Sequence, residues 1–183
     1  MPMRLSRGQE LVRAAALTGA VAPSSKFLAR AMVQAARGAG ALVELGAGTG
    51  PVTRALAHAY PDARLVVVEL RADLAERLRR AFPAAEVHAA PAAAVLRRLT
   101  DLPAETALVS SLPFRSLPSA VKRATVRSVL AFLRRDPARF MVQFSYYPGP
   151  PFRVPAGYRW QREAFVALNL PPASVWRLQA EGG

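Results

Sequence analysis

A glutamate and three glycines stand at alternate positions in the segment VELGAGTGP, as Glu44, Gly46, Gly48 and Gly50. Glycines in a turn between a strand and a helix let backbone N–H groups approach an anionic or polar ligand at the start of the helix. A dinucleotide site has the spacing G-x-G-x-x-G/A, but here proline stands where the third small residue would be. The segment therefore favours a ligand-binding turn for something other than a dinucleotide.

A second carboxylate, Glu69, stands at the end of the next apolar run, RLVVVEL. A carboxylate at the end of the second strand of such a fold can accept the hydroxyls of a ribose. Glu44 would repel a pyrophosphate but attract a positively charged amino group. A nucleoside with a positively charged amino-acid tail is S-adenosylmethionine, so these residues predict that cofactor. A structural turn without a ligand, or a nicotinamide or flavin cofactor, is the alternative.

The cofactor site is expected to use several strand ends and the turn APSS. The expected residues are Ser24, Ser25, Glu44, Gly46, Ala47, Gly48, Thr49, Gly50, Glu69, Leu70, Ala90 and Ser110. The segment after the third strand, VHAAPAAAV, contains no acid, so backbone groups and apolar side chains would have to hold an adenine ring. His88 in this segment is interpreted as structural, and no metal site is expected.

Apolar runs and helical patterns alternate along the chain, which is typical of a parallel sheet covered on both faces. After APSS we expect a helix whose buried side carries Phe27, Ala31, Met32 and Ala35. Strands are expected at 41–45, 64–70, 86–90, 106–111 and 139–147, and helices at 51–59, 71–82, 92–99 and 117–134. The segments 158–168 and 174–180 should form a hairpin around the turn NLPP.

The expected fold is α/β and Rossmann-like, with a seven-stranded, mostly parallel sheet, a terminal antiparallel hairpin and helices on both faces. It resembles the class I S-adenosylmethionine-dependent methyltransferase fold. Residues 1–22 are expected to form a basic N-terminal helix that acts as a membrane contact or a lid. Residues 23–183 are expected to form the methyltransferase domain.

The formal net charge of the chain is +13, and nearly all of the positive charge is arginine. Such a charge attracts nucleic acid, an anionic membrane surface or an acidic ligand, and biased genome composition is a further explanation. The chain has no cysteine, which excludes disulfides and thiol chemistry. No apolar run is long enough to span a bilayer. The basic, weakly amphipathic segment 1–17 could lie on a lipid surface or pack on the domain.

The fourth strand is followed by a loop with the sequence VSSLPFRSLP. Amino methyltransferases that act on nucleobases often have an Asn/Asp-Pro-Pro-Tyr-type or Asn-Leu-Pro-Tyr-type loop at this place. Here Leu112, Pro113 and Phe114 keep the Leu-Pro-aromatic order, but Ser110 replaces the amide. We interpret the loop as shaped for an amine, without the side chain that recognises a planar base.

Several segments together resemble the bacterial phospholipid N-methyltransferases. They are GAVAPSSKFLARAM, the glycine segment 42–53, VSSLPF, QFSYYPGP and NLPPASVW, and the resemblance covers roughly residues 18 to 178. It implies methylation of phosphatidylethanolamine and its mono- and dimethyl derivatives towards phosphatidylcholine. It also implies a cytoplasmic enzyme, expected to be a monomer, that associates peripherally with the inner face of the cell membrane.

Methyl transfer to an amine depends mainly on the alignment of the nitrogen, so positioning is expected to carry most of the catalysis. The residues expected to orient the nitrogen are Ser110, Leu112, Tyr146 and Tyr147. Substrate contacts are expected from Phe114, Tyr146, Tyr147, Phe152 and Arg153, with aromatic rings holding methylated ammonium by cation–π contact. The segment 1–17 would cover these strand ends as a lid, with Phe152 and Arg153 at its rim.

Three other functions stay open. The first is an rRNA or other nucleic-acid adenine N6-methyltransferase, against which the missing amide and the lack of an added domain after the hairpin both count. Nucleic acid is therefore not the expected partner. The second is an N-methyltransferase for another amino-lipid, such as an ornithine lipid. The third is a protein that binds S-adenosylmethionine without turnover.

Overall fold

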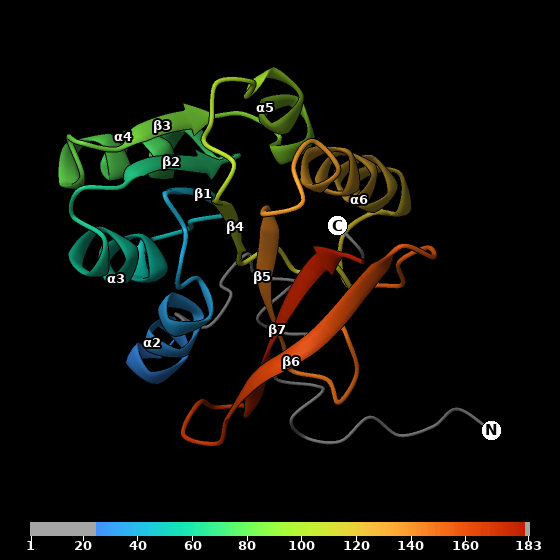
Figure 1. Ribbon diagram of the computed structural model, residues 1–183. Helices are drawn as coiled ribbons and strands as arrows, with labels where there is room; N and C mark the ends of the chain where they lie inside the picture. The colour runs from blue at the N-terminus through green and yellow to red at the C-terminus, as the bar shows by residue number, and fades with distance from the viewer. Residues whose placement is uncertain (1–24, 182–183) are drawn as a thin grey trace.

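A seven-stranded sheet lies at the centre of the computed structural model, which describes residues 25–181 (Figure 1). The strand order is β3-β2-β1-β4-β5-β7-β6. The strands are β1 (Ala41–Leu45), β2 (Arg64–Glu69), β3 (Glu86–Ala89), β4 (Thr106–Ser110), β5 (Phe140–Ser145), β6 (Tyr158–Val166) and β7 (Ala173–Ala180). β1 to β5 pair in parallel, whereas β7 pairs antiparallel with both β5 and β6. The predicted fold class is confirmed.

Five helices are described, and they cover the two faces of the sheet. They are α2 (Lys26–Ala35), α3 (Pro51–Ala59), α4 (Ala72–Ala81), α5 (Ala92–Arg98) and α6 (Ser119–Leu133). Pro51 begins α3, where a proline is tolerated because its missing N–H would have no helical partner. Ser25 caps α2, since its Oγ accepts the N–H of Leu28 at 3.2 Å.

Alternating side chains of the sheet supply two apolar layers. In β1, Leu42 points to the layer that contains α2 and α3, whereas Val43 and Leu45 point to the layer that contains α5 and α6. All three side chains are fully buried. Each such burial stabilises the fold by roughly 1.5–3 kcal/mol, and this two-sided burial explains why the strands read as continuous apolar runs.

The buried side of α2 differs from the prediction. Met32 and Ala35 are buried as expected, but Phe27 is 43% exposed. The inward residues include Leu28 and Val33 instead, so the buried face is rotated by about one position from the predicted one. The cause is the alanine-rich composition of the helix, which makes two neighbouring faces almost equally apolar.

The carboxyl ends of β1 to β5 lie together along one side of the sheet, perpendicular to the strands, which is called the carboxyl edge here. The turn 167–172 lies at the same edge, because β7 runs against β5: Ser174 near the start of β7 pairs with Ser145 at the end of β5, and Ala173 pairs with Val166 of β6. Ligands of doubly wound sheets bind at this edge. The opposite edge, where β1 to β5 begin, is called the amino edge.

Some predictions concern the N-terminus. The basic helix 1–22, the lid 1–17 and the cofactor residue Ser24 lie outside the described residues, and they stay predictions. Within residues 25–181, none of the helices combines the length and the apolar composition needed to cross a membrane.

Candidate active site

The glycine turn between β1 and α3 has a backbone that only glycine adopts easily. Gly46, Gly48 and Gly50 have φ angles of 77°, 57° and 85°, in the left-handed region. A Cβ at Gly46 would lie 2.8 Å from Leu112 Cδ2, so this glycine lets the loop after β4 pack against the turn. A Cβ at Gly48 would meet nothing within 4 Å, which leaves the backbone open to a ligand.

Glu69 holds the glycine turn from the neighbouring strand. Its Oε2 accepts the N–H of Gly48 at 2.8 Å, and its Oε1 accepts the N–H of Arg71 at 2.9 Å. The side chain is only 7% exposed. Each carboxylate oxygen keeps a second lone pair, so Glu69 can accept ribose hydroxyls while it fixes the turn.

Glu44 is the least satisfied polar side chain of the site. It is fully buried, and within the described residues neither carboxylate oxygen has a hydrogen-bond partner of normal geometry. Burial raises its pKa from 4.5 to about 7, which the neighbouring Thr53 offsets in part and the charge of Glu69 increases. A buried carboxylate without partners is costly unless a cation reaches it. A ligand with an ammonium group fits this residue.

The other predicted cofactor residues differ in exposure. Ala47 is buried, Gly50 is packed against Leu78, Ala90 is half-buried, and Thr49 and Leu70 are exposed. All of them lie at the carboxyl edge, as the strand ends dictate. Ser25 lies there too, because its N–H donates to Oδ1 of Asn169 in the hairpin turn at 3.3 Å.

The loop 111–118 is fixed by hydrogen bonds that the sequence did not reveal. Ser110 is fully buried, and its Oγ accepts the N–H of Leu112 at 3.2 Å. The carbonyl of Leu112 accepts both Gln143 Nε2 at 3.2 Å and the N–H of Phe114 at 2.9 Å. Both lone pairs of this carbonyl are therefore in use. Ser110 and Leu112 thus shape the loop, and their predicted role in orienting the nitrogen stays a prediction.

Gln143 was missed in the sequence. It is 2% exposed on β5, and its Nε2 also donates to the carbonyl of Phe144 at 2.9 Å. Its Oε1 has no partner among the described residues. The only signal was a polar residue inside an apolar strand, which is also common in structural positions.

The two tyrosines after β5 have different partners. Tyr146 packs beside Phe144, with ring centroids 5.2 Å apart, on the side of α2. Burial raises the pKa of the Tyr146 phenol above its usual value, and the nearby Asn169 side chain lowers it in part. This phenol therefore stays protonated at neutral pH. The ring of Tyr147 lies 4.2 Å from the Arg115 guanidinium, which connects the loops after β4 and β5.

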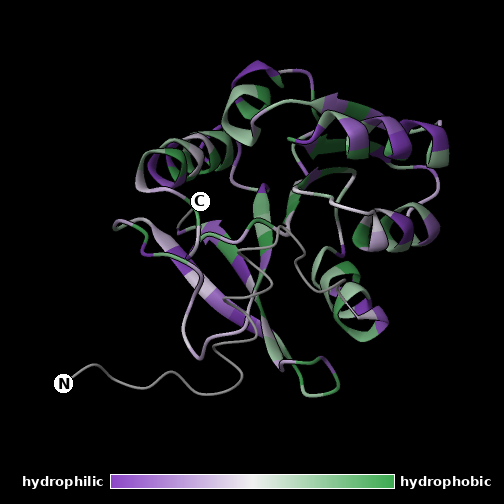
Figure 2. Ribbon diagram, turned by 180° about the vertical axis from the view of Figure 1, so that it is seen from behind, coloured by the Kyte–Doolittle hydropathy of each residue, from purple (hydrophilic) through white to green (hydrophobic). Residues whose placement is uncertain are grey.

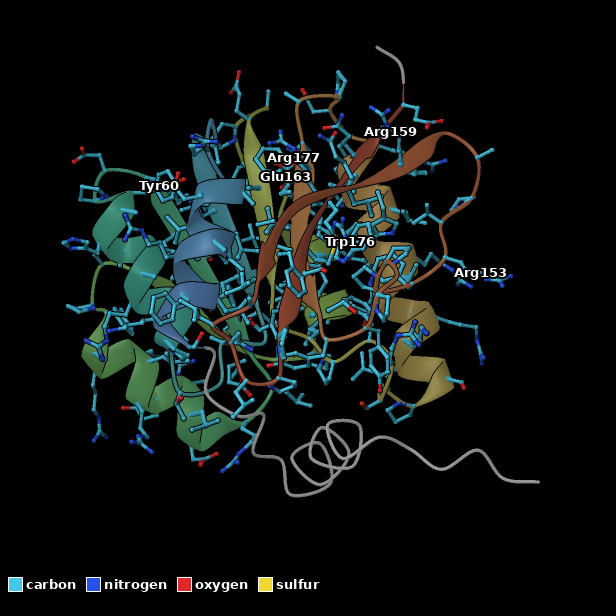
Figure 3. All side chains as sticks on the ribbon, turned by 90° about the horizontal axis from the view of Figure 1, so that it is seen from below. Tyr60, Arg153, Arg159, Glu163, Trp176 and Arg177 are labelled. Carbon is cyan, nitrogen blue, oxygen red and sulfur yellow. The ribbon has the colours of Figure 1, made fainter. Side chains whose placement is uncertain are left out.

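Phe114 and Phe152 form part of the core on the α6 side. They are 2% and 6% exposed, and their ring centroids are 4.6 Å apart. Phe152 also packs against Trp160 at 5.1 Å, so its predicted place at an exposed rim is wrong. Phe114 and Tyr146 belong to opposite layers, so these two rings do not pack against each other. Arg153 is exposed, and its side chain points outward at the margin of the molecule (Figure 3).

Neither histidine belongs to this site. His88 Nε2 lies 2.8 Å from Glu86 Oε1 in an exposed pair on β3, and His58 is in the last turn of α3, which runs towards the amino edge. Residues 25–181 contain no group of three or more acidic or histidine side chains that could hold a metal ion. Glu44 can bind a cation, and Glu69 can bind a group with several hydroxyls. The loop 111–118 beside them contains no histidine that could act as a base.

The chain is similar to a known lipid-modifying enzyme. It is 35% identical over 169 residues to the ornithine lipid N-methyltransferase of Singulisphaera acidiphila, and the match covers 85% of each chain. No protein-family profile matches the chain.

Solved structures of methyltransferases share the fold. A TehB-like S-adenosylmethionine-dependent methyltransferase of Corynebacterium glutamicum superimposes with a TM-score of 0.59 at 15% identity, over 94% of this chain and 95% of that one. A methyltransferase of Podospora anserina with bound S-adenosylhomocysteine gives a TM-score of 0.59 at 11% identity, over 100% of each chain. At these identities the two structures support the fold alone.

Proposed function

Because the chain belongs to the family of the ornithine lipid N-methyltransferase, a group of S-adenosylmethionine-dependent enzymes with the class I fold, we propose that it methylates the terminal headgroup amine of a membrane amino-lipid, with ornithine lipid as the first candidate. The observation that carries the proposal is the 35% identity, which extends over 85% of both chains. S-adenosylmethionine as the cofactor and N-methylation of a lipid follow from the family. The identity of the lipid is the proposed part.

The residues at the carboxyl edge fit the cofactor. Glu44 would hold the ammonium group of the cofactor, and Glu69 would accept its ribose hydroxyls. The open backbone at Gly48 would let the turn lie against the cofactor. The cofactor supplies an electrophilic methyl group on a sulfonium centre. The ammonium group of the bound cofactor would favour the charged form of Glu44, which burial disfavours.

The acceptor side works by orientation. A headgroup ammonium must lose its proton before its nitrogen can act as a nucleophile, and burial beside a positive centre lowers its pKa. Tyr146 keeps its own proton, so it can accept or donate a hydrogen bond but does not act as a base. The rigid loop of Ser110 and Leu112, held by Gln143, would keep the nitrogen aligned.

Phosphatidylethanolamine is the second candidate acceptor. The motifs VSSLPF, QFSYYPGP and NLPPASVW resemble phospholipid N-methyltransferases, which supports it. Both candidate lipids combine a terminal primary amine with a nearby anion, a carboxylate in one and a phosphate in the other. Arg115 is exposed beside Tyr147 and could pair with either anion.

The test is a transfer assay with isotopically labelled S-adenosylmethionine. Purified protein is incubated separately with ornithine lipid, with phosphatidylethanolamine and with total RNA, the lipids being dispersed in detergent. Glu69→Ala is the matched control for label that arises without a cofactor site. We expect label in one of the lipids with the wild type only. Label in RNA alone would contradict the proposal and support the nucleic-acid alternative.

A further inference from the structure

The exposed large apolar side chains of the described chain all lie at one end of the molecule. They are Phe27 (43% exposed), Leu70 (67%), Val121 (48%), Phe165 (63%), Leu168 (72%) and Leu170 (86%). Leu70 directly follows the last residue of β2, and Val121 lies in the first turn of α6, after the loop that leaves β4. Phe165 pairs with Ser174 near the end of β6. Each position is thus at the carboxyl edge.

The turn of the β6–β7 hairpin has its polarity reversed. Asn169 is 4% exposed, whereas its neighbours Leu168 and Leu170 point into solvent. The Asn169 side chain accepts the N–H of Ser25 and donates to the carbonyl of Pro171 at 2.7 Å. These bonds hold the turn beside α2, and the hydrophobic colouring of the turn next to that helix is visible in Figure 2. A turn that served only to connect two strands would expose the asparagine and bury the leucines.

Few acidic side chains are exposed at this end of the molecule. Glu44 and Glu69 are buried, and Asp73, which is exposed, is paired with Arg71 at 2.7 Å. Most of the other exposed or half-exposed acids lie around the amino edge: Asp62, Glu86, Asp101, Glu105, Asp136 and Glu181. Glu76 lies in the middle of α4, where it is paired with Arg79 and Arg80, and Glu163 is exposed on β6, two residues before Phe165.

Exposed basic side chains are present at the carboxyl edge, among them Lys26 beside Phe27 and Arg115 beside Tyr147. This edge therefore combines apolar and positively charged groups. An anionic bilayer has the complementary chemistry, with negative headgroups over an apolar interior.

We propose that the carboxyl edge is a membrane-docking face, in which the hairpin residues Phe165, Leu168 and Leu170 enter an anionic bilayer beside the site. The proposal rests on the proposed lipid acceptor and names a contact separate from the segment 1–17. A lipid headgroup can then reach the strand ends while its chains stay in the bilayer. The apolar side chains extend from β2 to β6, five strands apart, which is roughly 24 Å at about 4.8 Å per strand. Such a wide, sparse arrangement suits a fluid surface better than a compact protein partner.

The test is sedimentation with vesicles that contain no amine. Wild-type protein is mixed with phosphatidylcholine vesicles, with or without phosphatidylglycerol, in the absence of cofactor. Leu168→Gln/Leu170→Gln tests the apolar contact, and Lys26→Gln tests the charge. Arg134→Gln is the matched charge control, because Arg134 is exposed at the end of α6, towards the amino edge.

We expect wild-type binding to require phosphatidylglycerol and to weaken with salt. The double leucine variant should lose at least about tenfold in partitioning. Lys26→Gln should lose about fivefold and Arg134→Gln should lose little, since each basic group at an anionic surface contributes about that factor. If the double variant does not fold, Leu168→Gln alone should lose several-fold and takes its place.

The proposal would be overturned if the double leucine variant sedimented with the vesicles as fully as the wild type does. A dimer that the substitutions dissociate would also overturn it, since a second copy would then cover the face. A large loss of stability without a change in vesicle binding would mean that another part of the chain covers the leucines. Methylation of detergent-dispersed lipid is measured separately with the same variants and should be unchanged. Loss of vesicle binding with intact methylation supports docking, whereas absent methylation with intact docking contradicts only the proposed function.

Discussion

The substitution Glu44→Gln should separate the stability of the fold from its ability to bind the cofactor. Glu44 is fully buried, and its carboxylate oxygens have no hydrogen-bond partner of normal geometry within the described residues. Glutamine has nearly the same shape but carries no charge. The variant therefore removes the titration of this site while it leaves the packing around it almost unchanged.

The magnitude follows from the raised pKa of Glu44. In the folded protein this pKa is about 7, against an ordinary value of 4.5. At about 1.4 kcal/mol per pH unit, the difference corresponds to about 3 kcal/mol. Between these two pH values the folded state holds a proton that the unfolded state has lost, so the free energy of unfolding falls as the pH rises. The full cost is present above about pH 7 and is absent below about pH 4.5.

The assay is urea unfolding of the wild type and of Glu44→Gln at about pH 5 and about pH 8, without ligand. A buried glutamine amide has a cost of its own, about 1–3 kcal/mol, but this cost does not change with pH. The difference between the two proteins should therefore shift by about 2–3 kcal/mol in favour of the variant as the pH rises. Other titrating groups are common to both proteins and cancel.

Cofactor binding should change in the opposite direction. S-adenosylhomocysteine should bind the wild type less tightly as the pH falls below about 7, by up to about tenfold per pH unit, because Glu44 must release its proton to face the ligand ammonium. Glu44→Gln should bind weakly throughout, without this pH dependence. A stability difference that stays constant between the two pH values, together with normal affinity of the variant, would refute the reasoning.

Three further outcomes are expected. Gly46→Ala should lower both stability and S-adenosylhomocysteine affinity, because its Cβ would lie 2.8 Å from a leucine atom. Gly48→Ala, where a Cβ would meet open space, should cost only about 1–2 kcal/mol of stability but should still lower the affinity in calorimetric titration. Glu69→Ala should abolish measurable binding while the thermal transition remains cooperative, because the N–H groups of Gly48 in the turn and of Arg71 lose their acceptor and the ribose loses its own. Gln143→Met should lower kcat by about tenfold to a hundredfold with nearly normal cofactor affinity, and the matched Gln161→Met on the exposed edge strand should change neither.

Much of the fold could be predicted from the sequence because it depends on local patterns. The alternation of apolar runs and helices predicted the type of sheet. The observed ends of the elements differ from the predicted ends by at most two residues, as for α6, which spans Ser119–Leu133 where 117–134 was predicted. The positions of Glu44 and Glu69 at neighbouring strand ends followed from the same pattern, since parallel strands end at one edge.

The remaining features depend on partners distant in sequence. The burial of Phe152 depends on Phe114 and Trp160, which come from other segments. Gln143 and Asn169 look like isolated polar residues until the fold brings Leu112 and Ser25 to them. Short motifs identify chemistry at a strand end, but they do not indicate which side of the sheet the neighbouring loops will cover.

The central claim, N-methylation of a membrane amino-lipid, is tested most directly by finding the atom that receives the methyl group. Purified protein is incubated with methyl-deuterated S-adenosylmethionine and a detergent-dispersed mixture of ornithine lipid and phosphatidylethanolamine, and the intact lipids are fragmented by mass spectrometry. We expect deuterated methyl groups on a headgroup nitrogen with the wild type and none with Glu69→Ala. Deuterium on no lipid, while S-adenosylhomocysteine still binds tightly, would contradict the claim and leave a protein that binds the cofactor without this reaction.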